Sequence, residues 1–270
     1  MPTSAGSRVR ALLAALALAA PGVAAAQSAP QPTSRALDIE LFQPGPGRYD
    51  LPGLYSSRVQ GHLTVHGGLL YNASVNPLTA GAEGNELRLV ASRHTVDVLA
   101  ALGLFDRVEL GVAIPVTLRQ YSDAYNPVTF QPVGELETVT ALQDVRLVPK
   151  VRIWDSGGLA VAAVAPVFLP TGRRDLFLAQ GFGAAPMAVV DYSGENWKVG
   201  VNAGLRFRGR QQFLGLVIGN EFVWSLGGQY RIPVTGDEMP LAAWAAINGR
   251  IALSRANDTA LTAGSAPTEA

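Results

Sequence analysis

The feature that most constrains this chain is a long alternation of apolar and polar residues with a period of two. Between Val108 and Arg119 every even-numbered position is apolar, whereas the odd-numbered positions include Glu109 and Thr117. The same alternation returns over residues 145–153, 197–208 and 221–231. A period of two places successive side chains on opposite faces of a β-strand. The pattern therefore predicts an all-β fold.

Weaker alternation runs through residues 62–72, 87–102, 159–169, 186–192 and 241–253. Together these segments indicate roughly nine strands, many of them longer than the mean of about five or six residues in globular proteins. Tilted strands of about 9 to 11 residues are long enough to cross a bilayer. No helical pattern separates the strands, which excludes a βαβ architecture.

The connections between the strands alternate in length along the chain. Residues 105–107, 155–158, 193–196 and 233–239 form short connections, whereas residues 73–86, 121–143, 170–184 and 209–219 form long ones. Outer-membrane barrels have short periplasmic turns and long external loops, whereas a soluble sandwich, the alternative all-β fold, has no reason to follow this rule. We therefore expect an antiparallel up-and-down transmembrane β-barrel over residues 57–270, with lipid on the apolar face and a lumen on the polar face.

Composition agrees with a membrane barrel and excludes several other classes of protein. Hydrophobic residues make up 48% and charged residues only 16% of the chain, yet no apolar run after the N-terminal segment reaches the roughly 18 residues of a transmembrane helix. The formal net charge of +0 argues against a nucleic-acid partner. The absence of cysteine excludes disulfide bonds and thiolate metal sites.

The N-terminus has the layout of a secretory signal peptide. Arg8 and Arg10 precede the apolar run at residues 11–20, and three alanines end at Ala26. We expect cleavage near Ala26, which leaves residues 27–56 as a periplasmic leader with a turn-rich stretch. An uncleaved helix or anchor is the alternative. Export of a barrel predicts the outer membrane of a Gram-negative-type envelope, with outer-membrane lipid and the barrel-assembly machinery as partners.

Several segments resemble known outer-membrane barrels. Residues 51–69, 103–116 (GLFDRVELGVAIPV), 144–151 (DVRLVPKV) and 165–172 (APVFLPTG) are similar to the N-terminal barrel of OmpA-family and barrel-type transporter proteins. The resemblance implies an outer-membrane barrel, followed in some relatives by a periplasmic peptidoglycan-binding domain. A peptidoglycan link would require such a domain after Ala270.

The strand count carries a further expectation. Bacterial single-chain barrels have an even number of strands, whereas about nine are visible here and residues 265–270 (SAPTEA) resemble a loop. Either the count is short by one, or the chain is a fragment that stops after an outward-going ninth strand. We expect a fragment of a complete barrel with about ten to twelve strands.

The sequence offers little that points to catalysis. There is no nucleophile motif of the G-x-S-x-G type, and His62 and His66 have no evident third metal ligand. We therefore expect a protein that is not an enzyme and that needs neither a cofactor nor a metal ion.

The functional hypothesis rests on charge at the positions that parity assigns to the inward face. Basic residues outnumber acidic ones there, and basic rings favour anions in a pore. The sequence thus predicts a passive or solute-selective channel for small solutes, with a preference for anions. The candidate lumen-lining residues are Arg93, Asp97, Glu109, Arg119, Asp144, Arg146, Lys150, Arg152, Lys198, Arg206, Arg208, Glu221, Arg231 and Arg250.

The alternative is that these charges pair across strands and fill a narrow interior, as side chains do in barrels of about eight strands. A plugged barrel of this kind would have a structural, envelope-anchoring or adhesion role, with the loops at residues 121–143 and 170–184 as its external surface.

Overall fold

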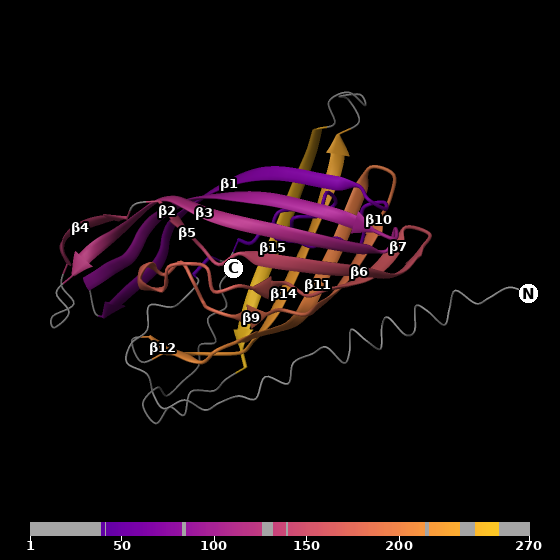
Figure 1. The fold of residues 1–270 in the computed structure, drawn as a ribbon. Helices are drawn as coiled ribbons and strands as arrows, with labels where there is room; N and C mark the ends of the chain where they lie inside the picture. Colours follow the sequence, from indigo (N-terminus) through magenta and orange to yellow (C-terminus); the bar gives the residue numbers. More distant parts are fainter. Residues whose placement is uncertain are drawn as a thin grey trace, which may run out of the picture. The chain divides into compact units, whose positions relative to one another are not determined.

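The computed structural model describes residues 39–40, 42–82, 85–125, 132–138, 140–213, 216–232 and 241–253, all of which lie in the compact unit that spans residues 32–270. One antiparallel sheet dominates this part of the chain (Figure 1). Its main path consists of β1 (Val65–Ala82), β2 (Asn85–Leu104), β3 (Val108–Tyr125), β6 (Arg146–Ser156), β7 (Leu159–Val164), β10 (Met187–Ser193), β11 (Trp197–Arg208), β14 (Glu221–Ile232) and β15 (Leu241–Ala252).

Each strand of this path pairs with the next one along the chain, and every pair is antiparallel. This order confirms the predicted all-β, up-and-down, barrel-like fold. The strands β1 and β15 stand at the two ends of the hydrogen-bonded order. Among the described residues, no helix is long and apolar enough to span a membrane.

The two ends of the strands differ in how they are connected. At one end, which we call the short-turn end, β2 and β3 are joined by residues 105–107, β6 and β7 by residues 157–158, and β10 and β11 by residues 194–196. Gly157 and Gly158 have φ values of 60° and 92°. A two-residue type I′ hairpin needs positive φ at both positions, which glycine adopts without steric cost.

Short elements fill the connections at the opposite end, which we call the long-loop end. They are β4 (Pro132–Thr138), β5 (Ala141–Leu142), β8 (Val167–Phe168), the 3₁₀ helix η1 (Arg174–Leu176), β9 (Gly183–Ala184) and the hairpin of β12 (Gln211–Phe213) with β13 (Leu216–Ile218). Residues 73–86, expected as a loop, instead extend β1 and β2 as far as the pair Ala82 and Asn85. A register shift after Val75 accommodates Asn76 and Pro77 as an irregularity, so the turn residues do not end the strand.

The sheet reverses the arrangement of polar and apolar side chains found in soluble proteins. Its outward face exposes large apolar residues, with Val201 at 48% and Leu226 at 48%, whereas the side chains of Arg93, Lys150 and Arg206 on the opposite face are each 1% exposed. Charged residues are almost never buried in a soluble protein without a partner. An apolar outer face and a polar inner face are what a transmembrane barrel requires.

Candidate functional site: the polar interior

An irregular stretch of chain before β1 lies against the inner face of the sheet. We call residues 42–60 the inner segment. Its residues Pro44, Pro46, Leu54, Ser57 and Gln60 are all buried. Prolines lack a backbone N–H, so they reduce the number of donors that such a buried stretch must satisfy. The inner segment therefore occupies space inside the sheet that the strand pattern alone predicts to be an open lumen.

A buried cluster of three charges ties the inner segment to the wall near the short-turn end. The Lys150 Nζ atom lies 2.7 Å from Asp50 Oδ1 of the inner segment and 2.8 Å from Glu109 Oε1 on β3. The backbone N–H of Gln60 donates to the second oxygen of Glu109 at 3.1 Å. Each of these side chains is almost fully withdrawn from solvent, so each charge depends on the others for stabilisation.

A second cluster holds the middle of the inner segment against β10 and β11. The Asp191 carboxylate accepts hydrogen bonds from Ser56 Oγ at 2.7 Å and from the backbone N–H of Ser57 at 2.8 Å. Lys198 Nζ lies 3.1 Å from the same carboxylate. Because the Asp191 carboxylate accepts from both a side chain and the backbone, it fixes the position of the inner segment. It also balances the positive charge of Lys198.

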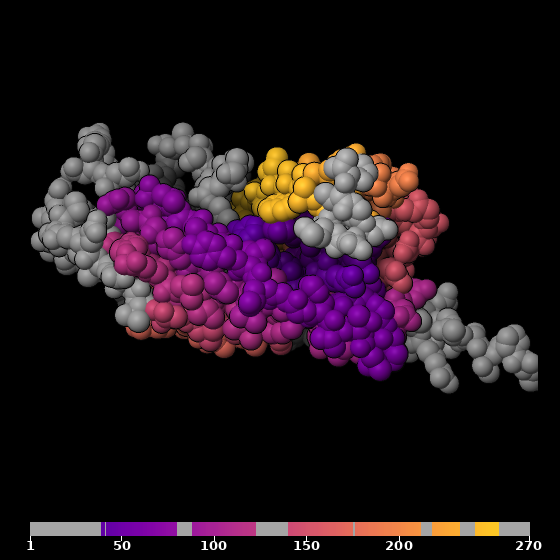
Figure 2. Space-filling view, turned by 90° about the horizontal axis from the view of Figure 1, so that it is seen from above, coloured from indigo at the N-terminus to yellow at the C-terminus, as the bar shows by residue number. Residues whose placement is uncertain are grey.

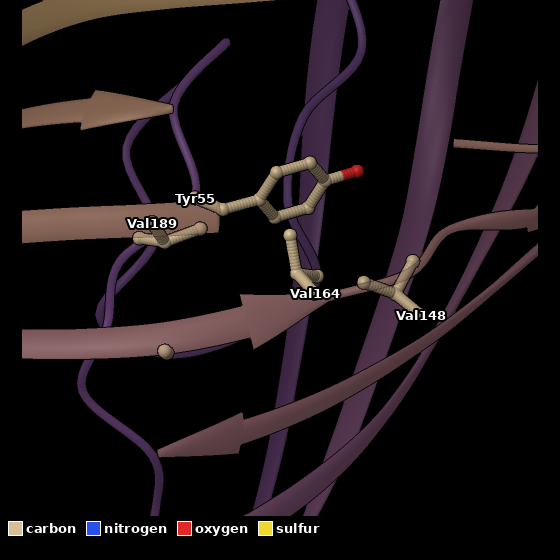
Figure 3. Close-up of a cluster of buried hydrophobic side chains, with 5 residues drawn as sticks. Tyr55, Val148, Val164 and Val189 are labelled. Atoms are coloured by element: carbon tan, nitrogen blue, oxygen red, sulfur yellow. The ribbon is translucent and has the colours of Figure 1, made fainter. Parts of the chain in front are cut away.

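Apolar contacts accompany these polar ones. The ring of Tyr55 packs in a buried cluster with Val148 of β6, Val164 of β7 and Val189 of β10 (Figure 3). Burial raises the pKa of the Tyr55 phenol, which is therefore neutral at pH 7. Leu51, Leu54 and Val59 of the inner segment are buried as well, so both polar and apolar contacts attach it to the wall.

A loop from the long-loop end also turns inward. We call residues 170–185 the inward loop. The Asp144 carboxylate accepts from three of its backbone N–H groups, those of Gly172 at 3.0 Å, Gln180 at 2.7 Å and Gly181 at 3.0 Å. On its other side, Arg93 donates to the carbonyl of Phe177 at 2.9 Å. This loop was expected to be an external surface, and the structure instead buries much of it.

A small cavity lies between Glu40, Phe42 and Gln43 on one side and the inner face of the sheet on the other. Its volume is about 20 Å³, which is enough for about one water molecule. Its lining combines charged, amide and aromatic side chains, namely those of Glu40, Phe42, Gln43, Thr95, Asp97, Pro115, Gln143, Asp144, Arg146 and Phe168.

The candidate lumen-lining residues fall into three groups by exposure. Those buried are Arg93, Asp97, Glu109, Asp144, Arg146, Lys150 and Arg206, those of intermediate exposure are Arg152, Lys198, Arg208, Glu221 and Arg250, and those exposed are Arg119 and Arg231. Arg119 was expected to point inward, but the pairing of β2 with β3 is irregular between His94 and Thr95. Leu118 has no partner residue on β2 there, and the side chain of Arg119 is exposed as a result. Arg231 keeps its parity but lies one residue from the end of β14.

Ion pairs join most of the inward basic side chains to carboxylates. Arg146 pairs with Asp97 at 3.2 Å, and Arg208 pairs with Glu221 at 2.6 Å. Arg152 pairs with Asp155 near the short-turn end, where both side chains are partly exposed. Within the described part of the chain, no group of three or more potential ligands is placed to hold a metal ion.

Sequence reasoning missed three acidic residues of the interior, namely Glu40 and Asp50, which precede the strands, and Asp191, which lies at an inward position of β10. Asp50 contacts Lys150, and Glu40 contacts Arg93 at 4.0 Å. Both precede the first alternating segment, so strand parity gave no signal for either. With these three included and the exposed Arg119 and Arg231 left out, the interior holds eight basic and seven acidic side chains, so most of the predicted excess of positive charge disappears.

A charged, hydrogen-bonded interior behind an apolar outer face defines a barrel-like protein of the outer-membrane type. Residues 72–245, more than half of the chain, match the family described as "Putative MetA-pathway of phenol degradation", and the chain belongs to this family. Comparisons with curated proteins and with solved structures give no match. The matched family is not the OmpA family, so the OmpA resemblance is not carried further.

Proposed function

We propose that this protein is an outer-membrane channel for small solutes, exported after cleavage near Ala26 and closed at rest by its own inner segment. The observation that carries the proposal is that residues 42–60 are fixed to the inner face at several points by hydrogen bonds and ion pairs. The contacts of Asp50 with Lys150 and of Ser56 with Asp191 are the principal examples.

Polar attachment makes the closed state reversible in principle. A hydrogen bond inside a protein contributes only about 0.5–1.5 kcal/mol net, because water offers the same groups alternative partners. If the inner segment moves, water can solvate the polar wall that it leaves. An apolar plug would lose this compensation, since its departure would expose hydrocarbon surface on both partners.

The solute that we propose is a small neutral aromatic molecule of the phenol class. The family description names phenol degradation, and this supports an aromatic solute. Anion preference loses its support, because the inward cations have carboxylate partners in Asp97, Asp191 and Glu221. The interior cavity of about 20 Å³ is too small for such an aromatic molecule, so the solute would enter only after the inner segment moves, and Phe42 and Phe168 are aromatic side chains that it would then meet.

Conductance in planar bilayers tests the closure. The double variant Asp50→Asn, Asp191→Asn weakens two attachments of the inner segment while keeping side-chain size. We expect the unaltered protein to show low, infrequent conductance and the double variant to show a conductance several times higher. The control is Asp155→Asn, which removes a partly exposed ion pair at the short-turn end and should leave conductance unchanged.

The same bilayers test the choice of solute. Phenol added to the opened variant should reduce the ionic current by occupying the lumen, whereas cyclohexanol, which has similar size but no aromatic ring, should reduce it less. Reversal potentials in a salt gradient should show no strong anion preference. Equal effects of the two alcohols would contradict the aromatic solute, and a strong anion preference would restore the hypothesis drawn from the sequence.

A permanently plugged barrel with a structural role is the second candidate. The withdrawal of Lys150, Asp50 and Glu109 from solvent favours it, because separating a buried charge cluster is costly. If the double variant folds and inserts but conducts no better than the unaltered protein, the structural role is the correct one.

A further inference from the structure

The two end strands of the sheet are not joined to each other by their backbones. In the described part of the chain, no backbone hydrogen bond links β1 to β15. The outward side chains of β1 are correspondingly open, with Val65 at 73%, Leu69 at 76% and Val75 at 79%, whereas Val199 on the interior strand β11 is 47% exposed. We call the line along which β1 and β15 face each other the seam.

The directions of β1 and β15 explain why the seam lacks the antiparallel backbone hydrogen bonds found between the other strands of the sheet. In an alternating antiparallel order of nine strands, the first and the ninth run the same way. Both β1 and β15 therefore run from the short-turn end to the long-loop end. A direct pair between them would be parallel, in contrast to every other pair of the sheet.

Hydrogen bonds to a single residue, Glu40, connect the two sides of the seam. Glu40 Oε1 accepts a hydrogen bond from Asn72 Nδ2 of β1 at 2.9 Å, and the backbone carbonyl of Glu40 accepts one from Arg250 of β15, also at 2.9 Å. In Figure 2 the indigo N-terminal part of the described chain lies beside the yellow β15. One residue from outside the sheet thus contacts both of its ends.

The inner face beside the seam is only weakly polar closer to the short-turn end. The inward positions of β1 there are His66, Gly68 and Leu70, and those of β15 are Ala242, Trp244 and Ala246. On some strands farther from the seam, the inward positions toward the same end carry charges, such as Lys150, Asp191 and Lys198. Closer to the short-turn end, the two strands that border the seam therefore carry no Asp, Glu, Lys or Arg at their inward positions, as is also the case on β2 and β7.

We propose that the seam is a lateral passage through which an apolar or weakly polar aromatic solute moves between the interior and the bilayer, and that Glu40 is its latch. This proposal rests on the channel function proposed above. Unpaired backbone groups facing hydrocarbon are costly, so the passage is closed at rest and opens when solute and water line its edges. A charged solute could not leave by this path, because the hydrocarbon would not solvate it.

Uptake of N-phenyl-1-naphthylamine tests the passage. This neutral aromatic dye fluoresces on reaching hydrocarbon, and it is added to Gram-negative cells that lack their general porins and express the full chain. We expect faster uptake than in cells with an empty vector. Glu40→Ala should increase the rate by about fivefold, the factor that corresponds to one lost hydrogen bond.

Cross-linking isolates the seam from the rest of the interior. The chain has no cysteine, so Leu70→Cys with Ala246→Cys supplies one reactive pair across the seam. A flexible bifunctional maleimide should lower dye uptake to the vector level, whereas a monofunctional maleimide of similar bulk should not. The matched control is Leu226→Cys with Ile247→Cys, two paired residues on the outer face of β14 and β15, where the cross-link should leave uptake unchanged.

Each result has a distinct meaning for the two proposals. Undiminished uptake after cross-linking the seam would overturn the lateral passage. Dye uptake at the vector level in all variants, together with raised conductance of the Asp50→Asn, Asp191→Asn variant, would also overturn it while leaving the channel intact. Neither dye uptake nor conductance in any correctly inserted variant would refute the channel itself.

Discussion

The side-chain amine of Lys150 lies 2.7 Å from the carboxylate of Asp50, although 100 positions separate the two residues in the sequence. Neither side chain has any exposed surface. The contact fixes a stretch without regular secondary structure to β6, the fourth strand on the main path of the sheet. The inner segment is thus as much a part of the folded structure as the strands around it.

Replacing Lys150 by methionine should destabilise the protein strongly. The substitution would leave Asp50 and Glu109 buried together without their shared cation, a change that costs about 3–5 kcal/mol. The free energy of unfolding can be measured by urea titration of the protein refolded into phospholipid vesicles. Adding Glu109→Gln and Asp50→Asn to the Lys150→Met variant should recover part of the loss, and no recovery would argue against the charge cluster as its cause.

Gly47→Val should displace the inner segment without altering any charge. A Cβ atom at Gly47 would lie 2.8 Å from Asp50 Oδ2 and 2.9 Å from Lys150 Nζ, both too close for a stable contact. With Ser57→Cys as the single thiol, reaction with a maleimide should be slow in the parent and at least several times faster in the Gly47→Val variant. Gly67→Val is the control, since the nearest atom to its Cβ is 3.9 Å away. Equal labelling rates in the two variants would contradict the tight packing around Gly47.

Asp144→Ala should release the inward loop. The carboxylate holds three backbone N–H groups, which would be left without this acceptor at a cost of about 1–3 kcal/mol. Trypsin should then cleave after Arg173 or Arg174 much faster than in the unaltered protein. Asp155→Ala, at the opposite end of the strands, should not change the cleavage rate, and rapid cleavage in that control would point to general unfolding instead.

Val201→Arg should test the apolar outer face. This side chain is 48% exposed near the middle of β11, so in a bilayer it would lie near the centre of the hydrocarbon. An arginine at the midplane of a membrane barrel costs about 2–4 kcal/mol. Leu63→Arg, at an exposed position before β1, should cost little by comparison. Urea titration in vesicles compares the two, and equal stabilities would contradict a membrane location for this face.

The alternation of residues predicted the strands well, because each strand has one apolar and one polar side to satisfy. It failed where the backbone departs from regular pairing. An irregularity at Leu118 places Arg119 on the exposed side, although the parity of the preceding ten residues is correct. The alternation assigns side chains to the correct face only while the strand is regular. It does not reveal where an extra residue is inserted.

The interior could not be predicted as well as the wall. The inner segment has no periodicity, and its prolines and glycines are equally typical of an exposed linker. Its position depends on contacts with residues such as Lys150 and Asp191, which are distant in the sequence. Most of the predicted surplus of inward positive charge came from leaving out Glu40, Asp50 and Asp191 and from counting Arg119 and Arg231, which are exposed.

The hydrogen bond between Arg250 and Glu40 spans 210 positions of the chain, and it has a consequence for the order of folding. Residues near the N-terminus are synthesised first, yet this contact cannot form until the last described strand is in place. Contacts of such long sequence separation are slow to form because a large loop must close first. A late, slow phase in refolding should therefore report the docking of the N-terminal residues after the sheet has assembled around them.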